Sequence, residues 1–262
     1  MRAACPTLLL AAALTTGPRP AAGAPEPLRP GLADALVVAG LLAADLALEF
    51  GAPEDESPNW TAHNGLDDGV RDGLRGASRE GRERARQASN VTLPLALALP
   101  PLLVLGAEDQ RVTRAVGVVA LEAEAVLAAT LLTQVTKRLV ARARPWTRDE
   151  SRPDRHDPYR SFFSGHSSTT FAAAGATCAL QSRGHLVDGG TPWICSGAFA
   201  TAATTGLLRI VADEHYATDV LTGAAAGTAC GLFGTWLRLG DPKGEGPTVS
   251  AQGPLMMVSG VF

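Results

Sequence analysis

Residues 161–182 read SFFSGHSSTTFAAAGATCALQS, a short polar segment that leads into an alanine-rich apolar run. Ser164, Gly165 and His166 stand where the apolar run begins. Small hydroxyl residues cap the free N–H groups of a first helical turn, and glycine allows the chain to bend into it. One interpretation is therefore a helix start. The other is an anion site, because a helix N-terminus presents free N–H groups and the positive end of the helix dipole.

The apolar run belongs to a series of similar segments. Six of them, rich in Ala, Leu and Val, lie at residues 32–50, 91–107, 115–136, 167–182, 191–208 and 220–237. Strand-like alternation is scarce, so the pattern predicts an all-α fold, a helical bundle of about six apolar helices. We expect an N-terminal helix and polar loop over 25–89, the helical core over 90–239, and a flexible tail over 240–262.

The composition narrows the class of protein. The chain has 262 residues, 46% of them hydrophobic, and a formal net charge of -3. This balance excludes a strongly basic nucleic-acid binder. Residues 1–24 have the pattern of an export signal, with Arg2 before an apolar stretch and small residues at 22–24. The sequence therefore predicts an exported protein.

Several segments have the length and composition of membrane spans. Residues 87–107, 189–208 and 220–237 carry no charge and are long enough, or nearly so, to cross a bilayer. Other apolar segments contain acids, which are costly in a span unless they face the bundle interior: Asp34, Asp45, Glu49, Glu122 and Glu124. The pattern favours a protein of the cell membrane. A soluble periplasmic protein is the alternative.

The cysteines do not indicate a metal site. Of four cysteines, Cys5 lies in the predicted signal, and Cys178, Cys195 and Cys230 lie in apolar segments. Buried free thiols are the favoured interpretation and one disulfide is the alternative. Because the sequence has no CxxC motif and no Cys/His cluster, we expect no bound metal and no cofactor.

Two further segments carry residues suited to chemistry. In KRLVARARP, residues 137–145, Lys137 and Arg144 are seven positions apart and would share one helical face about 10 Å apart along the axis. In RIVADEHYATD, residues 209–219, His215 and Asp219 have the spacing of neighbours on one helical face. A carboxylate beside one imidazole nitrogen fixes the tautomer and leaves the other nitrogen free to react.

Each of the three polar segments lies at the end of an apolar segment, so a bundle can bring all of them to one rim. Together they supply three cations, two histidines, a carboxylate, a hydroxyl and a glycine amide. This set suits a phosphate, because arginines make two-pronged contacts with its oxygens. One histidine can attack phosphorus while the other protonates the leaving oxygen. Catalysis of phosphoryl transfer consists largely of positioning and charge stabilisation.

The order and spacing of these residues resemble a known family. The pattern is Lys137, six residues, Arg144-Pro145; then Ser164-Gly165-His166; then Arg209, five residues, His215, three residues, Asp219. It is similar to the type 2 phosphatidic acid phosphatase superfamily, which also includes bacterial acid phosphatases and vanadium haloperoxidases. The resemblance covers about residues 90–237. Two positions depart from the usual pattern, with Phe163 in place of a common proline and Leu208 in place of a common serine.

The resemblance implies roles for individual residues. His215 would be the nucleophile that forms a phosphohistidine, and Asp219 would orient it. His166 would protonate the departing alcohol and then activate water. The phosphate oxygens would be held by Lys137, Arg144, Ser164, Gly165 and Arg209.

The resemblance also implies an activity, and a site that faces outward, the side on which family members of this layout work. We expect an exported, metal-independent and vanadate-sensitive phosphatase whose substrate is a phosphorylated lipid, a lipid pyrophosphate or a small phosphate monoester. A vanadium-dependent haloperoxidase on the same fold is the first alternative. A membrane protein with a degenerate, non-catalytic site is the second. A serine hydrolase that uses Ser164 is disfavoured, because the GxSxG motif is absent. The sequence makes no prediction about the oligomeric state.

Overall fold

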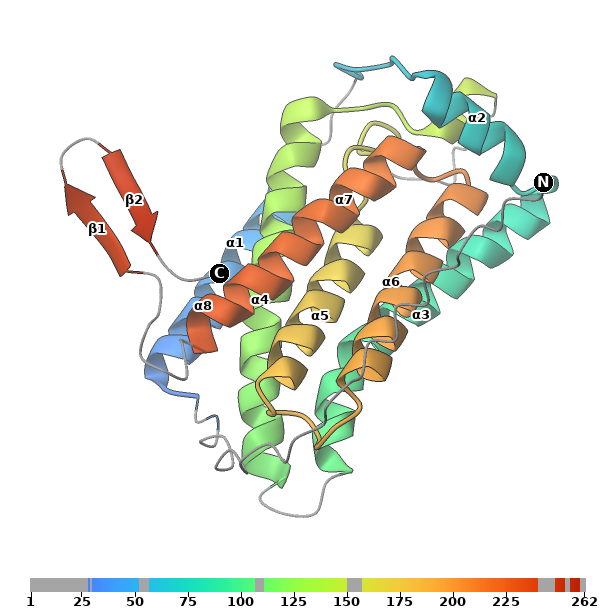
Figure 1. The fold of residues 1–262 in the computed structure, drawn as a ribbon. Coiled ribbons are helices and arrows are strands. Elements are labelled where there is room, and N and C mark those ends of the chain that lie inside the picture. Colours follow the sequence, from blue (N-terminus) through green and yellow to red (C-terminus); the bar gives the residue numbers. More distant parts are fainter. Residues whose placement is uncertain are drawn as a thin grey trace, which may run out of the picture.

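The computed structural model describes residue 28 and residues 30–51, 57–106, 111–149, 157–239, 248–252 and 255–259. The predicted export signal at 1–24 lies outside the described residues, as does much of the predicted tail. The helices run in the order α1 Leu32–Gly51, α2 Gly65–Leu74, α3 Arg79–Leu105, α4 Arg111–Val140, α5 Gly165–Ser182, α6 Thr191–Val211, α7 Ala217–Ala229 and α8 Thr235–Leu239 (Figure 1). A short 3-10 helix spans Pro145–Arg148.

The predicted helical bundle is confirmed. Each of the six apolar segments forms a long helix, and the last one continues from α7 through a π-helical turn, Cys230–Gly234, into α8. Within the predicted tail, β1 Thr248–Gln252 and β2 Leu255–Ser259 pair as an antiparallel hairpin beside the bundle (Figure 1). Polar side chains define two helix starts, because Asn64 accepts the Asp67 N–H at 3.0 Å and Ser78 accepts the Gly81 N–H at 3.0 Å.

Helix α5 forms the centre of the bundle. Fourteen of its residues are buried, and it packs against α3, α4, α6 and α7. Most of these residues are Ala, Gly, Ser or Thr, whose small side chains let neighbouring helices approach closely. The tightest approach is that of the last helix, since a Cβ at Gly227 would overlap the Ser168 carbonyl and one at Gly231 the Ala172 carbonyl. The small residues of α5 and the glycines of the last helix are therefore required for the two helices to pack this closely.

Helix α1 packs along α4 on the outside of the bundle. It buries none of its own residues. Its acids face polar partners, as the sequence requires of acids in an apolar helix. Asp45 accepts a hydrogen bond from Thr130 at 2.7 Å, Glu49 accepts one from Gln134 at 2.6 Å, and Asp34 pairs with Arg238. These contacts place the start of α1 near the end of α8 and its last turn near the C-terminal end of α4.

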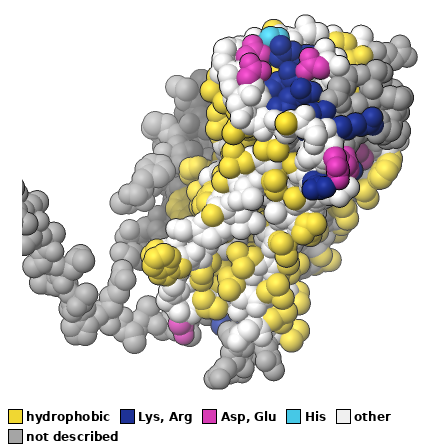
Figure 2. All heavy atoms as spheres, turned by 90° about the vertical axis from the view of Figure 1, so that its right-hand side faces the viewer, with side chains coloured by type: hydrophobic (Ala, Val, Ile, Leu, Met, Phe, Trp, Pro, Cys, Tyr) yellow, Lys and Arg dark blue, Asp and Glu magenta, His cyan; other side chains and the backbone are white. Residues whose placement is uncertain are grey.

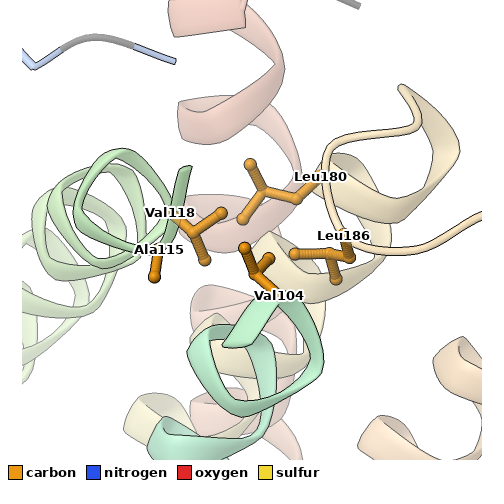
Figure 3. Close-up of a cluster of buried hydrophobic side chains, with 5 residues drawn as sticks. All are labelled: Val104, Ala115, Val118, Leu180 and Leu186. Carbon is orange, nitrogen blue, oxygen red and sulfur yellow. The ribbon is translucent and has the colours of Figure 1, made fainter. Parts of the chain in front are cut away.

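An apolar cluster closes the end of the bundle where α3 and α5 finish and α4 begins. It consists of Val104, Ala115, Val118, Leu180 and Leu186, all buried (Figure 3). Burying aliphatic side chains of this size stabilises the fold by roughly 1.5–3 kcal/mol each for the larger ones. The apolar cluster thus lies at one end of the bundle, and the polar motifs lie at the opposite end.

Four helices of the described chain are long and apolar enough to cross a membrane. They are Arg79–Leu105, Val112–Val140, Thr191–Val211 and Ala217–Leu239. Charged side chains gather at one end of the molecule, while hydrophobic side chains dominate the flank below it (Figure 2). This distribution suits a bundle embedded in a bilayer with its polar end in the headgroup region.

The structure distinguishes between the two interpretations of the cysteines. Cys178 of α5 and Cys195 of α6 form a disulfide, with their Cα atoms 5.1 Å apart. Cys230 is a free thiol. The favoured interpretation of buried free thiols is therefore wrong for the first two cysteines, because packing of α5 against α6 brings together two residues that lie 17 positions apart in sequence.

Candidate active site

The three polar motifs meet at one rim of the bundle, where α4 ends, α5 begins and the α6–α7 loop turns (Figure 1). Backbone contacts join them. The Ser161 N–H donates to the Arg142 carbonyl at 3.0 Å, and the Ser164 N–H donates to the Asp219 carbonyl at 3.0 Å. The Arg144 guanidinium donates to the Glu214 carbonyl at 3.1 Å. The structure thus brings the segments together as their positions in the sequence predict.

Helix α4 ends earlier than the sequence predicts. The expectation that Lys137 and Arg144 share one helical face is wrong, because α4 stops at Val140 and Ala141 has a positive φ of 42°. Beyond that point the chain pairs with another segment. The Ala143 N–H donates to the Trp60 carbonyl at 2.9 Å, a non-local contact that replaces a further helical turn. Arg144 consequently projects from an extended segment.

His215 is buried in the loop that precedes α7. Its Nδ1 lies 2.8 Å from the Ser161 carbonyl and therefore carries the proton that it donates there. Nε2 is left as the nitrogen with a lone pair. Burial lowers the pKa of the imidazole well below its ordinary value, and the positive charges of Arg144, Arg209 and Lys137 lower it further. The ring is thus a neutral base with Nε2 turned toward the cations.

Asp219 lies in the first turn of α7 and is fully buried. Its Oδ2 is 3.8 Å from His215 Nδ1, too far for a hydrogen bond. It accepts instead the Ser161 hydroxyl at 2.6 Å and the Tyr216 N–H at 2.9 Å. The residues have the spacing of helical neighbours, but α7 begins at Ala217, so His215 is outside the helix. Asp219 therefore reaches the imidazole through Ser161.

Arg144 and Arg209 approach His215 from two elements, and both are buried. Arg144 Nη1 lies 3.4 Å from His215 Nε2, and Arg144 Nε donates to the Asp157 carbonyl at 2.8 Å. Arg209 Nη1 donates to Ser89 Oγ at 3.2 Å. The Glu214 carboxylate lies between the two guanidiniums, with Oε2 3.1 Å from Arg144 and 3.8 Å from Arg209. The arginines are thus fixed cations beside the reactive nitrogen.

The start of α5 supplies the remaining motif residues. Ser164 is the N-cap and accepts the Ser167 N–H at 3.4 Å, so the helix-start interpretation is confirmed. Lys137 lies next to Gly165, because a Cβ on that glycine would be 3.4 Å from Lys137 Nζ. His166 Nε2 lies 2.9 Å from Asn90 Oδ1 of α3, so an amide holds its ring.

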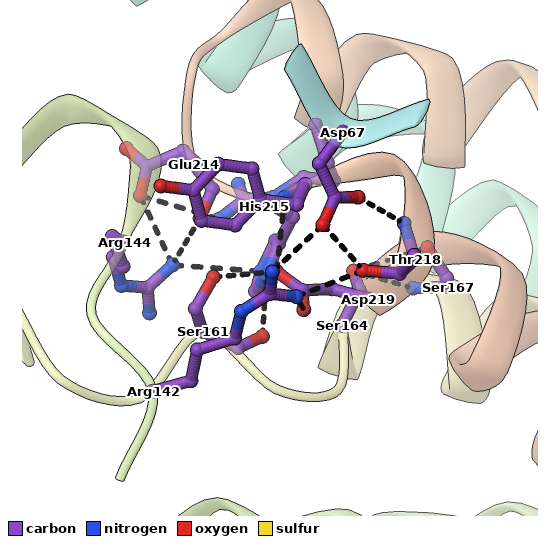
Figure 4. A network of polar contacts seen from close by, with 12 residues as sticks. Asp67, Arg142, Arg144, Ser161, Ser164, Ser167, Glu214, His215, Thr218 and Asp219 are labelled. Carbon is purple, nitrogen blue, oxygen red and sulfur yellow. Dashed lines mark hydrogen bonds and ion pairs between the residues drawn. The ribbon is translucent and has the colours of Figure 1, made fainter. Parts of the chain in front are cut away.

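Sequence analysis assigns no role to three residues of this region. Glu214 supplies the countercharge to the arginines, while Arg142 and Asp67 form a buried ion pair behind Asp219 (Figure 4). Asp67 stands in an acidic segment that has the composition of a solvated surface. Ion pairs between residues 75 positions apart leave no local pattern that a sequence motif could reveal.

Among the described residues, no group of three or more His, Cys, Asp and Glu side chains could hold a metal ion. The charges that face His215 are the cations of Lys137, Arg144 and Arg209, which belong to the protein itself. Such a set can stabilise the oxygens of a phosphoryl group through fixed positive charge.

Comparison with known proteins finds one family model and one relative that match parts of the chain. Residues 119–241 match the model of the PAP2 superfamily. The lipid A 1-phosphatase of Porphyromonas gingivalis is 39% identical over 88 residues, which cover 32% of this chain and 18% of that protein. The chain thus spans well under two thirds of the length of this relative.

Two solved structures resemble the bundle. A transmembrane PAP2-type phosphatidylglycerolphosphate phosphatase from Bacillus subtilis has 18% sequence identity and a TM-score of 0.49, over 77% of this chain and 93% of that one. LpxE from Aquifex aeolicus has 26% identity and a TM-score of 0.41, over 56% of this chain and 82% of that one.

Proposed function

Through residues 119–241 the chain belongs to the PAP2 superfamily, and from this premise we propose that it is a membrane phosphatase acting through a phosphohistidine. The observation that carries the proposal is the state of His215. Its Nδ1 proton is committed to the Ser161 carbonyl, so Nε2 is the nucleophilic nitrogen, and Arg144 stands 3.4 Å from it. Nucleophile and anion-binding charge therefore lie at one point of the rim.

The first half-reaction transfers the phosphoryl group to the protein. His215 Nε2 attacks phosphorus, a P–N bond forms, and the bond from phosphorus to the leaving oxygen breaks. Lys137, Arg144 and Arg209 balance the charge on the three remaining oxygens, with hydrogen bonds from Ser164 and the Gly165 N–H. Burial and the neighbouring cations lower the pKa of His166, and the negative charge of the bound phosphate opposes that shift. His166, protonated in the complex with substrate, then donates its proton to the leaving alkoxide, so the alcohol departs neutral.

The second half-reaction returns the protein to its starting state. His166, now without that proton, accepts one from a water molecule as the water oxygen attacks phosphorus. The P–N bond breaks, inorganic phosphate leaves, and His215 is neutral again. Because fixed cations stabilise the charge throughout, the reaction as proposed needs no divalent metal.

A lipid phosphate or lipid pyrophosphate is the substrate that suits this geometry best. Four helices of the described residues are long and apolar enough to cross a membrane, and the site lies at the end where charged side chains gather. A headgroup phosphate at the bilayer surface would reach this rim while its acyl chains stayed among the apolar flanks. The similarity to a lipid A 1-phosphatase over 88 residues supports the same class of substrate.

We expect the rim to face the outside of the cell membrane. Helix α1 runs from the end opposite the site toward the rim, so an outward rim leaves the start of α1 on the inner side. This orientation requires that residues 1–24 are not removed as an export signal, or that α1 does not cross the membrane. Arg111 and Arg114, in the first turn of α4, would also lie inside, as positive charge prefers. Reporter fusions within residues 146–160 test the orientation, and a cytoplasmic position there would contradict it.

The decisive experiment is phosphate release by the purified protein in detergent micelles. The panel comprises lipid phosphates, lipid pyrophosphates and soluble phosphate monoesters. His215→Ala should abolish turnover, and His166→Ala should reduce it by roughly 10²–10⁴-fold, the usual contribution of a general acid. Wild-type rates in folded His215→Ala protein would refute the nucleophile assignment.

A further inference from the structure

Helix α2 lies outside residues 119–241, the part of the chain that matches the family, but the side chain of its Asp67 points toward the site. Asp67, in its first turn, has no exposed surface. Its Oδ2 accepts Arg142 Nη2 at 2.7 Å and the Thr218 hydroxyl at 3.0 Å, and its Oδ1 accepts the Thr218 N–H at 2.9 Å. An ionised carboxylate buried in this way is held by a complete set of donors.

Arg142 carries the contact onward to α7. Its Nη1 donates to Asp219 Oδ1 at 2.5 Å, while Nη2 binds Asp67. The guanidinium lies between two aromatic rings, 4.1 Å from the Trp60 centroid and 4.3 Å from that of Tyr216. A planar cation can stack on both rings and still reach two carboxylates in its plane, which a lysine ammonium cannot do.

The chain of contacts ends at the candidate nucleophile. Asp219 Oδ2 accepts the Ser161 hydroxyl at 2.6 Å, and the carbonyl of that serine accepts His215 Nδ1–H at 2.8 Å. Asp67, Arg142, Asp219 and Ser161 thus form a continuous path from α2 to the imidazole (Figure 4). We name this path the relay.

Helix α2 and the residue after it also contact the α6–α7 loop, which carries His215, on its other side. Arg71 Nε donates to Asp213 Oδ1 at 2.7 Å, and Arg75 Nε donates to Asp213 Oδ2 at 2.7 Å. Asp213 is buried and has a positive φ of 61°. His215 therefore lies between two residues that contact α2 or its C-cap, Asp213 on one side and Thr218 on the other.

We propose that Asp67 is a positioning residue of the phosphatase and that α2 completes the active site from outside the family region. Acting through the relay, Asp67 holds the Ser161 carbonyl where it keeps the proton on His215 Nδ1. The inference rests on the proposed function of His215 as nucleophile. It adds a helix and a residue to which the sequence motifs assign no role.

The test compares two neighbouring aspartates. Asp67→Asn keeps the shape of the side chain but loses the charge opposite Arg142. Asp68→Asn is the matched control, because Asp68 lies at the surface and pairs with His63 and Arg148. We expect Asp67→Asn to lower kcat by roughly 10- to 100-fold and to change KM by less than about threefold, since misplacement of the nucleophile affects the chemical step. Asp68→Asn should change neither by more than about twofold.

A double-mutant cycle with Ser161→Ala separates the relay from a general loss of structure. Arg142 and Asp219 connect the Asp67 carboxylate to the Ser161 hydroxyl, the group that Ser161→Ala removes. If the relay acts as a unit, Asp67→Asn will cost at most about threefold in the Ser161→Ala background. If the loss of kcat in the double variant equals the product of the losses in the two single variants, the proposal is wrong. Asp67→Glu should restore part of the activity, because it returns the charge.

A second readout does not depend on turnover. Nitrogen NMR of histidine-labelled protein in micelles reports the tautomer of His215, which is identified by loss of its signal in His215→Gln. Asp67→Asn should mix the Nδ1–H and Nε2–H forms, while Asp68→Asn leaves the Nδ1–H form alone. An unchanged tautomer in Asp67→Asn refutes the relay, whether or not the protein hydrolyses phosphate. A wild-type protein that hydrolyses no phosphate refutes the proposed function, and the tautomer still tests the relay. Arg142→Lys serves as the second relay variant and should show the same mixing.

Discussion

Replacing Arg142 with methionine should destabilise the protein severely. Arg142 is 1% exposed, and its two ion-pair partners, Asp67 and Asp219, are fully buried. Its Nη1 and Nη2 contact them at 2.5 Å and 2.7 Å. Methionine fills the volume of the aliphatic stem and supplies no donor, so two buried carboxylates lose their countercharge.

The expected loss follows from this geometry. Breaking a buried ion pair by removing one partner costs about 3–5 kcal/mol, because an uncompensated charge remains inside. A domain of this size has a total stability of about 5–15 kcal/mol. The melting temperature should fall by about 6–20 °C, given roughly 2–4 °C per kcal/mol for chains of about this length.

Unfolding in detergent micelles, followed by circular dichroism, measures the effect. The matched control is Arg148→Met, which removes a partly exposed arginine that pairs with Asp68 at 2.8 Å and should cost less than about 1 kcal/mol. The double variant Asp67→Asn/Arg142→Met should recover about 1–3 kcal/mol, because it removes one of the two unpaired charges. A loss in Arg142→Met no larger than in Arg148→Met would refute the argument.

Three further predictions concern the active site. Burial, followed by the charges of Arg144, Arg209 and Lys137, lowers the pKa of His215, so the acid limb of kcat/KM should lie below the ordinary histidine value of about 6.5. The unfolded chain binds this proton at higher pH than the folded chain, so His215 also makes stability fall as the pH drops below about 6.5. A rate that already declines at neutral pH would contradict this prediction. Glu214→Gln should lower KM by about threefold to tenfold, because it removes a negative charge 3.1 Å from Arg144 that competes with phosphate. Steady-state kinetics measure the change. An unchanged or higher KM would show that the Glu214 carboxylate does not compete with substrate. Vanadate should compete with substrate at low concentration, since it mimics the five-coordinate transition state, and a chelator should leave phosphate release intact. Activity that vanishes with the chelator and returns with magnesium would overturn the metal-independent mechanism, and peroxide-dependent bromination without phosphate release would favour the haloperoxidase alternative.

Local sequence determines the helices and the place of the motifs. The apolar segments lack strand-like alternation and therefore form helices, and Ser164 caps α5 because its hydroxyl can satisfy a free N–H of the first turn. The polar motifs lie at segment ends, and antiparallel packing of consecutive helices is enough to bring those ends to one rim. These features depend on neighbours within a few residues, so they can be predicted without knowledge of distant contacts.

Only the tertiary structure decides where α4 ends. The helical pattern continues to Pro145, but residues 141–143 pair with the chain at 59–60 and leave the helix after Val140. A few backbone hydrogen bonds to a remote segment replace the last helical turn. Helix propensity is a weak preference of at most about 1 kcal/mol for residues other than proline, so such contacts can override it.

Tertiary structure likewise decides which charges are buried and what neutralises them. Asp67 and Asp68 are adjacent acids of the same short helix, yet the first is fully buried against Arg142 and the second pairs with surface groups. Arg142 and Asp219 are 77 positions apart, and nothing near either residue indicates the pairing. The sequence by itself determined the helices and the candidate reactive groups at their ends, because these follow from local pattern. The countercharges, the Ser161 contact of His215 and the role of α2 required the fold, because burial of a charge depends on every segment packed around it.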